Sequence, residues 1–206
     1  LGDSSLIIEN WSTHILEENV LPLNDVTLYL NGKKVADRQP LAMVWHNLFY
    51  KAEDGTPFSA EYNFKVINIP EGEVFAAIEN AENLDCITIN GNRVKPMKTP
   101  GEMGRFDVNK NWKDISFTKV SLTGFIKQGI NTLKIEGKKI NNITGPGTHI
   151  GVKDFKNHNA TEVETVYIVG KFSVVDENRT VFSIDGSIFE PDHKDITSSG
   201  YPFYAG

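Results

Sequence analysis

The sequence predicts an all-β protein, folded as an antiparallel β-sandwich. About eight short segments alternate apolar and polar residues with a period of two, as half-buried strands do. Turns that contain Asn-Gly or Gly separate these segments. Helical periodicity is nearly absent, and the best helix candidate, residues 10–20, is expected to form at most one turn. Because neighbouring parallel strands need crossover helices, the pattern favours antiparallel pairing.

Two tight hairpins are predicted from Asn-Gly dipeptides. Asn31-Gly32 separates VTLYL from KKVA, and Asn90-Gly91 separates CITI from NRV. Asn-Gly tolerates positive φ at both central positions of a type I′ turn, which joins adjacent antiparallel strands. In the second hairpin the two isoleucines of CITI share one face, and Cys86 is expected to be a small, buried strand residue.

The remaining predicted strands show the same alternation of apolar and polar residues. FSAEYNFKVIN (58–68) is the longest, with Phe, Ala, Tyr, Phe and Val on one face. The others are VFAAIEN (74–80), FTKVSLTGFI (117–126), TLKIEG (132–137), ETVYIVGKFSVV (164–175) and TVFSID (180–185). The aromatic residues of the tail, Tyr201, Phe203 and Tyr204, predict a further strand whose partner lies downstream.

The chain length fits one sandwich domain with flanking segments. We expect residues 1–38 to form an N-terminal connecting segment with a β-hairpin and residues 39–175 to form the sandwich. Residues 176–206 are expected to form a C-terminal segment that could begin a further sandwich module. The abrupt start, LGDSSLIIENW, and the abrupt end suggest a piece of a larger protein.

Composition and charge argue against several partners. The 206 residues are 39% hydrophobic and 23% charged, as in ordinary globular proteins. A net charge of −6 disfavours nucleic acid, because phosphate binding needs clustered Lys and Arg. Without a basic run, or an apolar run near the ~20 residues that span a bilayer, no membrane partner is expected. The single cysteine, Cys86, excludes an internal disulfide and a cysteine-based zinc site.

No catalytic residue, metal ligand or cofactor is predicted. Phosphate-binding glycine loops, the Gly-x-Ser-x-Gly motif and the Glu-x-Asp-x-x-Glu strand pattern of jelly-roll glycanases are absent from the sequence. The five histidines are scattered, without metalloprotease spacing. Glycoside hydrolysis needs two carboxylates opposed across ~5 to 9.5 Å, and sequence spacing alone shows no such pair.

Aromatic and polar residues at two places suit saccharide binding. Sugar rings have apolar C–H faces that stack on flat aromatic surfaces, while their hydroxyls bond polar side chains. Trp45 and His46 are expected just before a strand, and a long loop carries the other candidates. These are Arg105, Asp107, Asn111 and Trp112. The alternative for each tryptophan is a structural role, in which it closes one end of the sandwich core.

A resemblance to a known family rests on NVLPLNDVTLYLNGKKV, FSAEYNFKV, ENAENLDCITINGNRV, WKDISFTKVSLTGFIKQGINTLKIEG, VETVYIVGKFSV and GYPFYAG. Over most of residues 20–206 the chain resembles the galactose-binding-like modules, of the family-2 sugar-binding type, in large multidomain bacterial glycoside hydrolases. The resemblance implies a jelly-roll, galactose-binding-domain-like sandwich. It also implies that the catalytic carboxylates lie in a separate barrel domain, so that this chain carries none.

Two functions follow from the resemblance. The first is a non-catalytic accessory module that binds a plant-type oligosaccharide or polysaccharide containing rhamnose, galactose or uronate. One or two stacked aromatics and a few hydrogen bonds would give millimolar to high-micromolar affinity. The second is a structural spacer that braces the catalytic domain of the parent chain, its expected protein partner. An independent hydrolase is the least favoured function. A secreted or extracytoplasmic location is implied by the resemblance alone.

Overall fold

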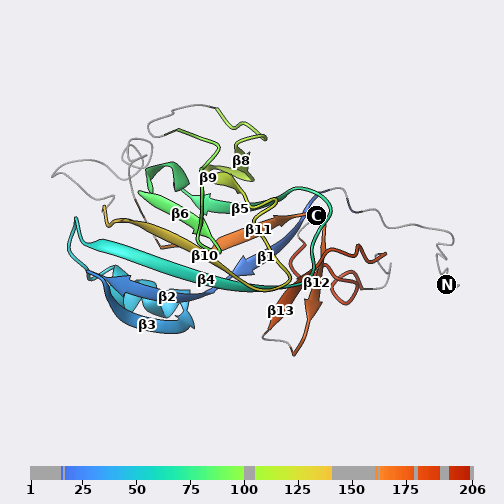
Figure 1. Cartoon of the computed structure of the whole chain (residues 1–206), viewed down its shortest axis with the longest axis horizontal. Coiled ribbons are helices and arrows are strands. Elements are labelled where there is room, and N and C mark those ends of the chain that lie inside the picture. The colour runs from blue at the N-terminus through green and yellow to red at the C-terminus, as the bar shows by residue number, and fades with distance from the viewer. Residues whose placement is uncertain are drawn as a thin grey trace, which may run out of the picture.

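The computed structural model describes residues 15, 17–99, 105–140, 161, 163–178, 181–190 and 195–204. It confirms the predicted all-β class: two sheets, called sheet A and sheet B, enclose a hydrophobic core in a sandwich-like arrangement (Figure 1). The described residues form thirteen strands, more than expected. β1 (Asn19–Leu23) and β8 (Asn111–Trp112) were not predicted, and the segment predicted at 164–175 divides into β11 (Val166–Gly170) and β12 (Ser173–Asp176). A jelly-roll order of these strands stays a prediction. Within the described ranges, no helix has the length and apolar character needed to cross a membrane.

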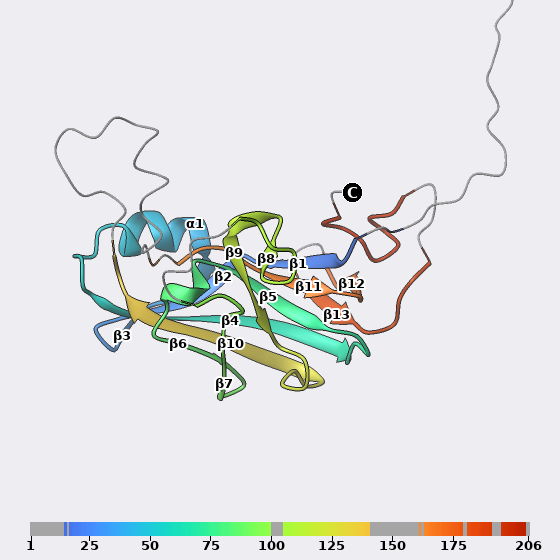
Figure 2. The ribbon, with the colours of Figure 1, turned by 90° about the horizontal axis from the view of Figure 1, so that it is seen from above.

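Sheet A is a five-stranded sheet in which all pairings are antiparallel. Its spatial order is β1 (Asn19–Leu23), β11 (Val166–Gly170), β5 (Val74–Glu79), β9 (Asp114–Ser121) and β8 (Asn111–Trp112). The strand at one edge, β1, therefore pairs with a strand that lies far away in the sequence. Figure 2 shows β1 and β11 above β4 and β10, which belong to the other layer.

Sheet B has eight strands, and β4 (Pro57–Asn68) lies at its centre. The path runs β12 (Ser173–Asp176), β13 (Phe182–Asp185), β4, β10 (Gly129–Lys138), β6 (Cys86–Ile89) and β7 (Asn92–Val94), with β2 (Asp25–Leu30) and β3 (Lys33–Pro40) off this path. One edge of β4 pairs with β10. The other edge is shared by β2, which is antiparallel, and β13, which is parallel. This parallel pair departs from the purely antiparallel expectation.

Both predicted Asn-Gly hairpins are confirmed. β2 pairs with β3, and β6 pairs with β7. Asn31 and Gly32 have φ values of 50° and 75°, and Asn90 and Gly91 have values of 51° and 82°. Positive φ at both central residues is the requirement of the type I′ turn, which Asn and Gly meet at little cost.

β4 has the predicted period of two. Burial alternates along the strand, and its inward side chains belong to the common core. Tyr62 is fully buried among them, and its hydroxyl donates a hydrogen bond of 2.8 Å to the carbonyl oxygen of Glu164. Burial holds the pKa of Tyr62 far above its usual range, so the phenol stays a neutral donor. This bond ties the middle of β4 to the chain that leads into β11.

Residues 41–49 form a helical segment that the sequence analysis did not predict. α1 (Leu41–Val44) continues directly into a π-helix, η1 (Trp45–Phe49). The apolar residues of LAMVWHNLF recur at helical spacing, so that one side of the segment packs against the core. These residues are Leu41, Val44, Trp45, Leu48 and Phe49. The expectation that Trp45 and His46 lie just before a strand is wrong, because β4 begins only at Pro57.

Two smaller expectations are also wrong. Cys86 is half-buried, not buried, because its neighbours in CITI alternate toward the core and leave its side chain on the outer face of sheet B. Residues 201–204 form turns and no strand. Tyr201 is buried there, and the ring of Phe203 packs against Phe182 with centroids 4.8 Å apart.

The sandwich was predicted to comprise residues 39–175. Segments on both sides of this range add strands to the same two sheets. From residues 1–38, β1 pairs with β11 and β2 pairs with β4. From residues 176–206, β13 pairs with β4. The described parts of the three predicted segments therefore contribute to one core.

Candidate functional site

Three aromatic side chains meet on the outer face of sheet A. In β11, Val166 and Ile168 face the core, so Tyr167 faces outward. The rings of Trp112 on β8 and Phe117 on β9 lie 4.9 and 5.5 Å from that of Tyr167, measured between centroids. The Trp112 and Phe117 rings meet edge to face at 88°. Tilted and edge-to-face contacts are favoured by the ring quadrupoles, so each ring helps to hold the others in place.

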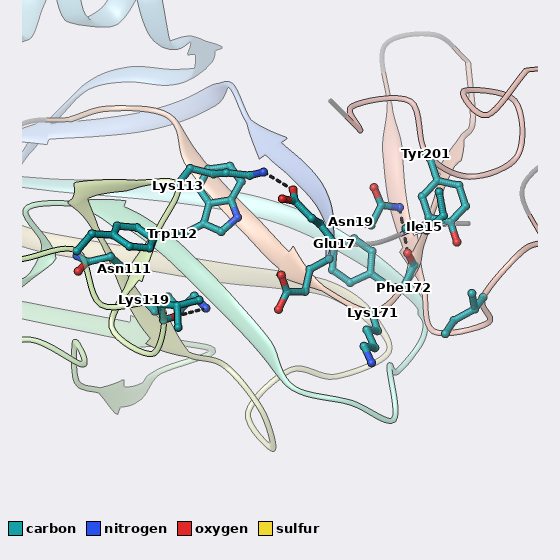
Figure 3. Close-up of a pocket in the computed structure, with 14 residues that line it drawn as sticks. Ile15, Glu17, Asn19, Asn111, Trp112, Lys113, Lys119, Lys171, Phe172 and Tyr201 are labelled. Carbon is teal, nitrogen blue, oxygen red and sulfur yellow. Dashed lines mark hydrogen bonds and ion pairs between the residues drawn. The ribbon is translucent and has the colours of Figure 1, made fainter. Parts of the chain in front are cut away.

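A cavity of about 730 Å³ opens beside this cluster, with Trp112 in its wall (Figure 3). We call it the large cavity. Three distant parts of the chain line it, and they include Glu17, Glu18, Phe106, Val108, Lys171 and Ile188. The parts that contain Glu18 and Lys171 come together because β1 pairs with β11, with Asn19 opposite Gly170.

Two lysines bond other residues that line the large cavity. The ammonium of Lys113 pairs with the Glu17 carboxylate, as Figure 3 shows. The Lys119 ammonium donates a hydrogen bond of 2.9 Å to the carbonyl oxygen of Val108 and lies 5.1 Å from the ring centroid of Phe75. Lys119 is buried, so its ammonium interacts with the Val108 carbonyl oxygen and the Phe75 ring and is not accessible to a ligand.

Two charged side chains of the large cavity are exposed to solvent. Glu18 and Lys171 line the cavity, and neither forms an ion pair with another described residue. They are therefore available to a ligand. A carboxylate accepts hydrogen bonds and an ammonium donates them, so together they can bind groups that do both.

The predicted ligands Asp107 and Asn111 instead shape the loop. Asn111 borders the large cavity, but it is only 2% exposed, and its amide donates 2.9 Å to the Ile115 carbonyl oxygen while its Oδ1 accepts 3.1 Å from the Asp107 amide. The Asp107 carboxylate accepts 2.9 Å from the amide of Asn109. Arg105 is exposed and does not line the cavity.

Trp45 lies at a different place, beside a second cavity of about 440 Å³. We call it the small cavity, and it is lined by Asn24, Pro40, Leu41, Ala42, Trp45, Glu164 and Thr165. The indole is half-buried, packs against the core and lies 5.2 Å from the Tyr50 ring. His46 is exposed and lines neither cavity. The structure thus separates the predicted site residues into two places.

Comparison with protein-family models, with curated proteins and with solved structures gives no match for this chain.

The chemistry of the site therefore follows from its own residues. No group of three or more His, Cys, Asp or Glu side chains that could hold a metal ion occurs in the part of the chain that the structure describes. The large cavity offers an aromatic wall, an exposed carboxylate and an exposed ammonium, a set suited to reversible binding of a polar molecule with an apolar face.

Several residues of the large cavity and of the aromatic cluster beside it were missed by the sequence analysis. Tyr167 of the cluster had a usable signal, because its neighbours Val166 and Ile168 alternate with it and predict that it faces outward. Glu18 and Lys171 had none. They meet only through the pairing of β1 with β11, a contact between residues about 150 positions apart that no local pattern indicates.

Proposed function

We propose that this protein is a non-catalytic, saccharide-binding accessory module of a larger glycoside hydrolase, and that the sugar binds in the large cavity. The observation that carries the proposal is the pairing of an aromatic wall, Trp112, with the exposed polar groups of Glu18 and Lys171 in one depression of about 730 Å³. The resemblance of the sequence to sugar-binding modules supports the same function.

The ligand class follows from this combination of groups. A pyranose ring has an apolar face that can stack on an indole, and hydroxyls that both donate and accept hydrogen bonds. Stacking contributes about 1 kcal/mol, and each hydrogen bond contributes a similar net amount. We therefore expect dissociation constants in the millimolar to high-micromolar range.

The arrangement of carboxylates supports a binding role over hydrolysis. The carboxylates that line the large cavity belong to Glu17 and Glu18, consecutive residues on one side of it. Glu17 is occupied by its ion pair with Lys113. Glycosidases instead place two carboxyl groups on opposite sides of the scissile bond.

The bracing function has its own supporting observation. Phe106, Val108 and Ile188 line the large cavity with exposed fractions of 51%, 64% and 61%. Exposed apolar side chains gathered in one patch are typical of protein–protein contacts. The same surface could therefore dock the catalytic domain of the parent chain, which makes bracing the second candidate.

Calorimetric titration separates the two functions. The ligands are galactan, rhamnogalacturonan and polygalacturonate oligosaccharides. We expect at least one of them to bind, and Trp112→Ala to weaken that binding about fivefold or more through loss of the stacking surface. Tyr29→Ala is the matched control, because Tyr29 is a half-buried aromatic residue on β2 in sheet B, away from the cavity.

Two further measurements guard against a folding artefact. Lys171→Met leaves the aromatic cluster intact and is expected to weaken binding about fivefold through loss of one charged hydrogen bond. Thermal unfolding shows that each variant is folded. Absence of binding to every ligand would overturn the saccharide proposal and favour bracing. Full binding by both cavity variants would overturn the placement of the sugar in the large cavity.

A further inference from the structure

We propose that the ligand is an extended saccharide chain that follows β1, with one subsite at Trp112 in the large cavity and a second at Trp45 in the small cavity. This inference rests on the proposed function and adds to it the length and direction of the ligand. Four observations support it.

The first observation is that the two cavities lie at opposite ends of one strand pair. Asn19, opposite Gly170, borders the large cavity, and Leu23, opposite Val166, is followed directly by Asn24 of the small cavity. Strands rise ~3.3 Å per residue, so Asn19 and Asn24 are roughly 16 Å apart. This separation, between the far border of the large cavity and the small cavity, exceeds one sugar ring and suits a short oligosaccharide.

The second observation is that outward-facing residues of β1 and β11 lie between the two cavities. The Tyr167 ring contacts Trp112, and Tyr167 lies opposite Pro22 of β1. Thr165, two residues before Tyr167, lines the small cavity. A chain leaving Trp112 would therefore pass Tyr167 and Pro22 and reach Thr165.

The third observation is that the small cavity has the same mixture of groups. The half-buried Trp45 indole supplies an aromatic surface, and Asn24 and Thr165 supply polar groups beside it. The Thr165 hydroxyl donates a hydrogen bond of 3.2 Å to Oδ1 of Asn24. An aromatic plane with an adjacent hydroxyl and amide repeats the chemistry expected of a sugar subsite.

The fourth observation is that the walls of the small cavity are fixed before a ligand arrives. The amide of Leu41 donates 2.7 Å to the carbonyl oxygen of Asn24, which joins the helical segment to the end of β1. The Tyr62 hydroxyl holds the Glu164 carbonyl from within the core. A preformed subsite costs little ordering when it binds.

The consequence is an affinity that rises with the length of the saccharide. A short ligand occupies the large cavity alone. A longer chain also reaches the small cavity, and the second contact is then intramolecular, so it adds to affinity at little entropic cost. One extra stacking contact predicts a gain of about fivefold or more.

The test is a calorimetric series with di-, tri-, tetra- and hexasaccharides of galactan and of polygalacturonate. Ala42→Arg fills the small cavity without removing a packed side chain, because Ala42 is exposed there and Arg is a good helix former. We expect the wild type to show the gain with length, and Ala42→Arg to lose it while its disaccharide affinity is unchanged. Met43→Arg is the matched control, since Met43 is 57% exposed and does not line the cavity.

A second variant tests the aromatic surface itself. Trp45→Ala is expected to lower hexasaccharide affinity about fivefold and to leave disaccharide affinity unchanged. Equal affinity for all lengths, or a length dependence that survives in Ala42→Arg, would overturn the extended-ligand inference while leaving saccharide binding at Trp112 intact. Failure of every saccharide to bind would instead overturn the proposed function and this inference together.

Discussion

The outer faces of the two sheets differ in what lies over them. On sheet B, polar side chains form local pairs in contact with water: the Thr132 hydroxyl donates 2.7 Å to Oδ1 of Asn63, and Lys134 pairs with Glu136 at 2.7 Å. On sheet A, the outer face carries the Trp112, Phe117 and Tyr167 cluster. Segments from both ends of the described chain and the loop before β8 line the large cavity beside that cluster.

The difference shows that the covering segments, and not the sheets themselves, decide what the outer positions hold. Lys119 and Lys134 both point outward from a central part of their sheets. Lys119 is buried beneath its loop and bonded to a carbonyl oxygen, whereas Lys134 is half-exposed and bonded to a neighbouring carboxylate. A covered face can hold a shaped cavity, while an open face presents solvated charge. The proposed ligand therefore belongs to sheet A.

The largest expected effect comes from comparing two ion pairs of similar length that differ in burial. Glu82, on the short 3₁₀-helix η2 (Ala81–Asn83), pairs with Lys98 at 2.8 Å, and their side chains are 5% and 8% exposed. Glu82 also accepts 2.6 Å from the Thr118 hydroxyl of β9. Lys98→Met leaves a buried carboxylate without its cation, and we expect it to lower the free energy of unfolding by about 3–5 kcal/mol.

The control for this prediction is Lys134→Met. Its pair with Glu136 has nearly the same length, but the side chains are 34% and 39% exposed. Solvent screens such a pair, so the expected change is below about 0.5 kcal/mol. Urea unfolding measures both variants, and equal losses would show that burial does not change what these ion pairs contribute to stability.

A smaller effect is expected for Lys119→Met. The substitution keeps the aliphatic stem but removes the bond to the Val108 carbonyl oxygen and the contact with the Phe75 ring. We expect a loss of about 1–2 kcal/mol and a changed fluorescence of Trp112, since the loop that carries Val108 borders the same cavity. Lys65→Met on the outer face of sheet B is expected to leave both the urea midpoint and the fluorescence unchanged.

The smallest effect concerns pH at the start of β9. The Ser116 amide donates 2.8 Å to the Asp114 carboxylate, and its hydroxyl donates 2.7 Å to the same oxygen. These two bonds hold the pKa of Asp114 below its ordinary 3.8, and the bond from the Ser116 amide has the larger effect. Because the folded-state pKa is depressed, the stabilisation is present above pH 3.8 and is lost as pH falls through the lower, folded value.

An NMR titration of the Asp114 side chain checks this direction, and a midpoint at or above 3.8 would contradict it. Asp114→Asn keeps an acceptor oxygen but cannot titrate. Urea midpoints of the two proteins are therefore expected to converge as the pH falls from about 6 to about 2.

Local rules predicted the fold where the structure depends on neighbours in sequence. Asn31-Gly32 and Asn90-Gly91 fix their own turns, and the alternation of β4 needs only a period of two. The helical segment at 41–49 was missed although its apolar spacing is helical, because α1 and η1 together span little more than two turns.

The candidate site was only partly predictable. Trp112, named from its residue type, lines the large cavity, whereas the side chains of Asp107 and Asn111 bond the backbone of their own loop. Asp and Asn side chains commonly bond nearby backbone amides in turns, as Asp107 does with the amide of Asn109 and Asn111 with the amide of Asp107. The other walls depend on long-range pairing: Lys113 meets Glu17 only because β8 and β1 belong to one folded sheet.

The shared edge of β4 has a consequence for how the chain can be shortened. β13 is the strand that pairs with β4 from Lys65 to Asn68. A truncation before residue 182 would remove that partner and leave a row of amide and carbonyl groups without bonds. An open edge of this kind recruits strands from other molecules, so a shortened protein is expected to associate or aggregate even with β2 and β10 in place.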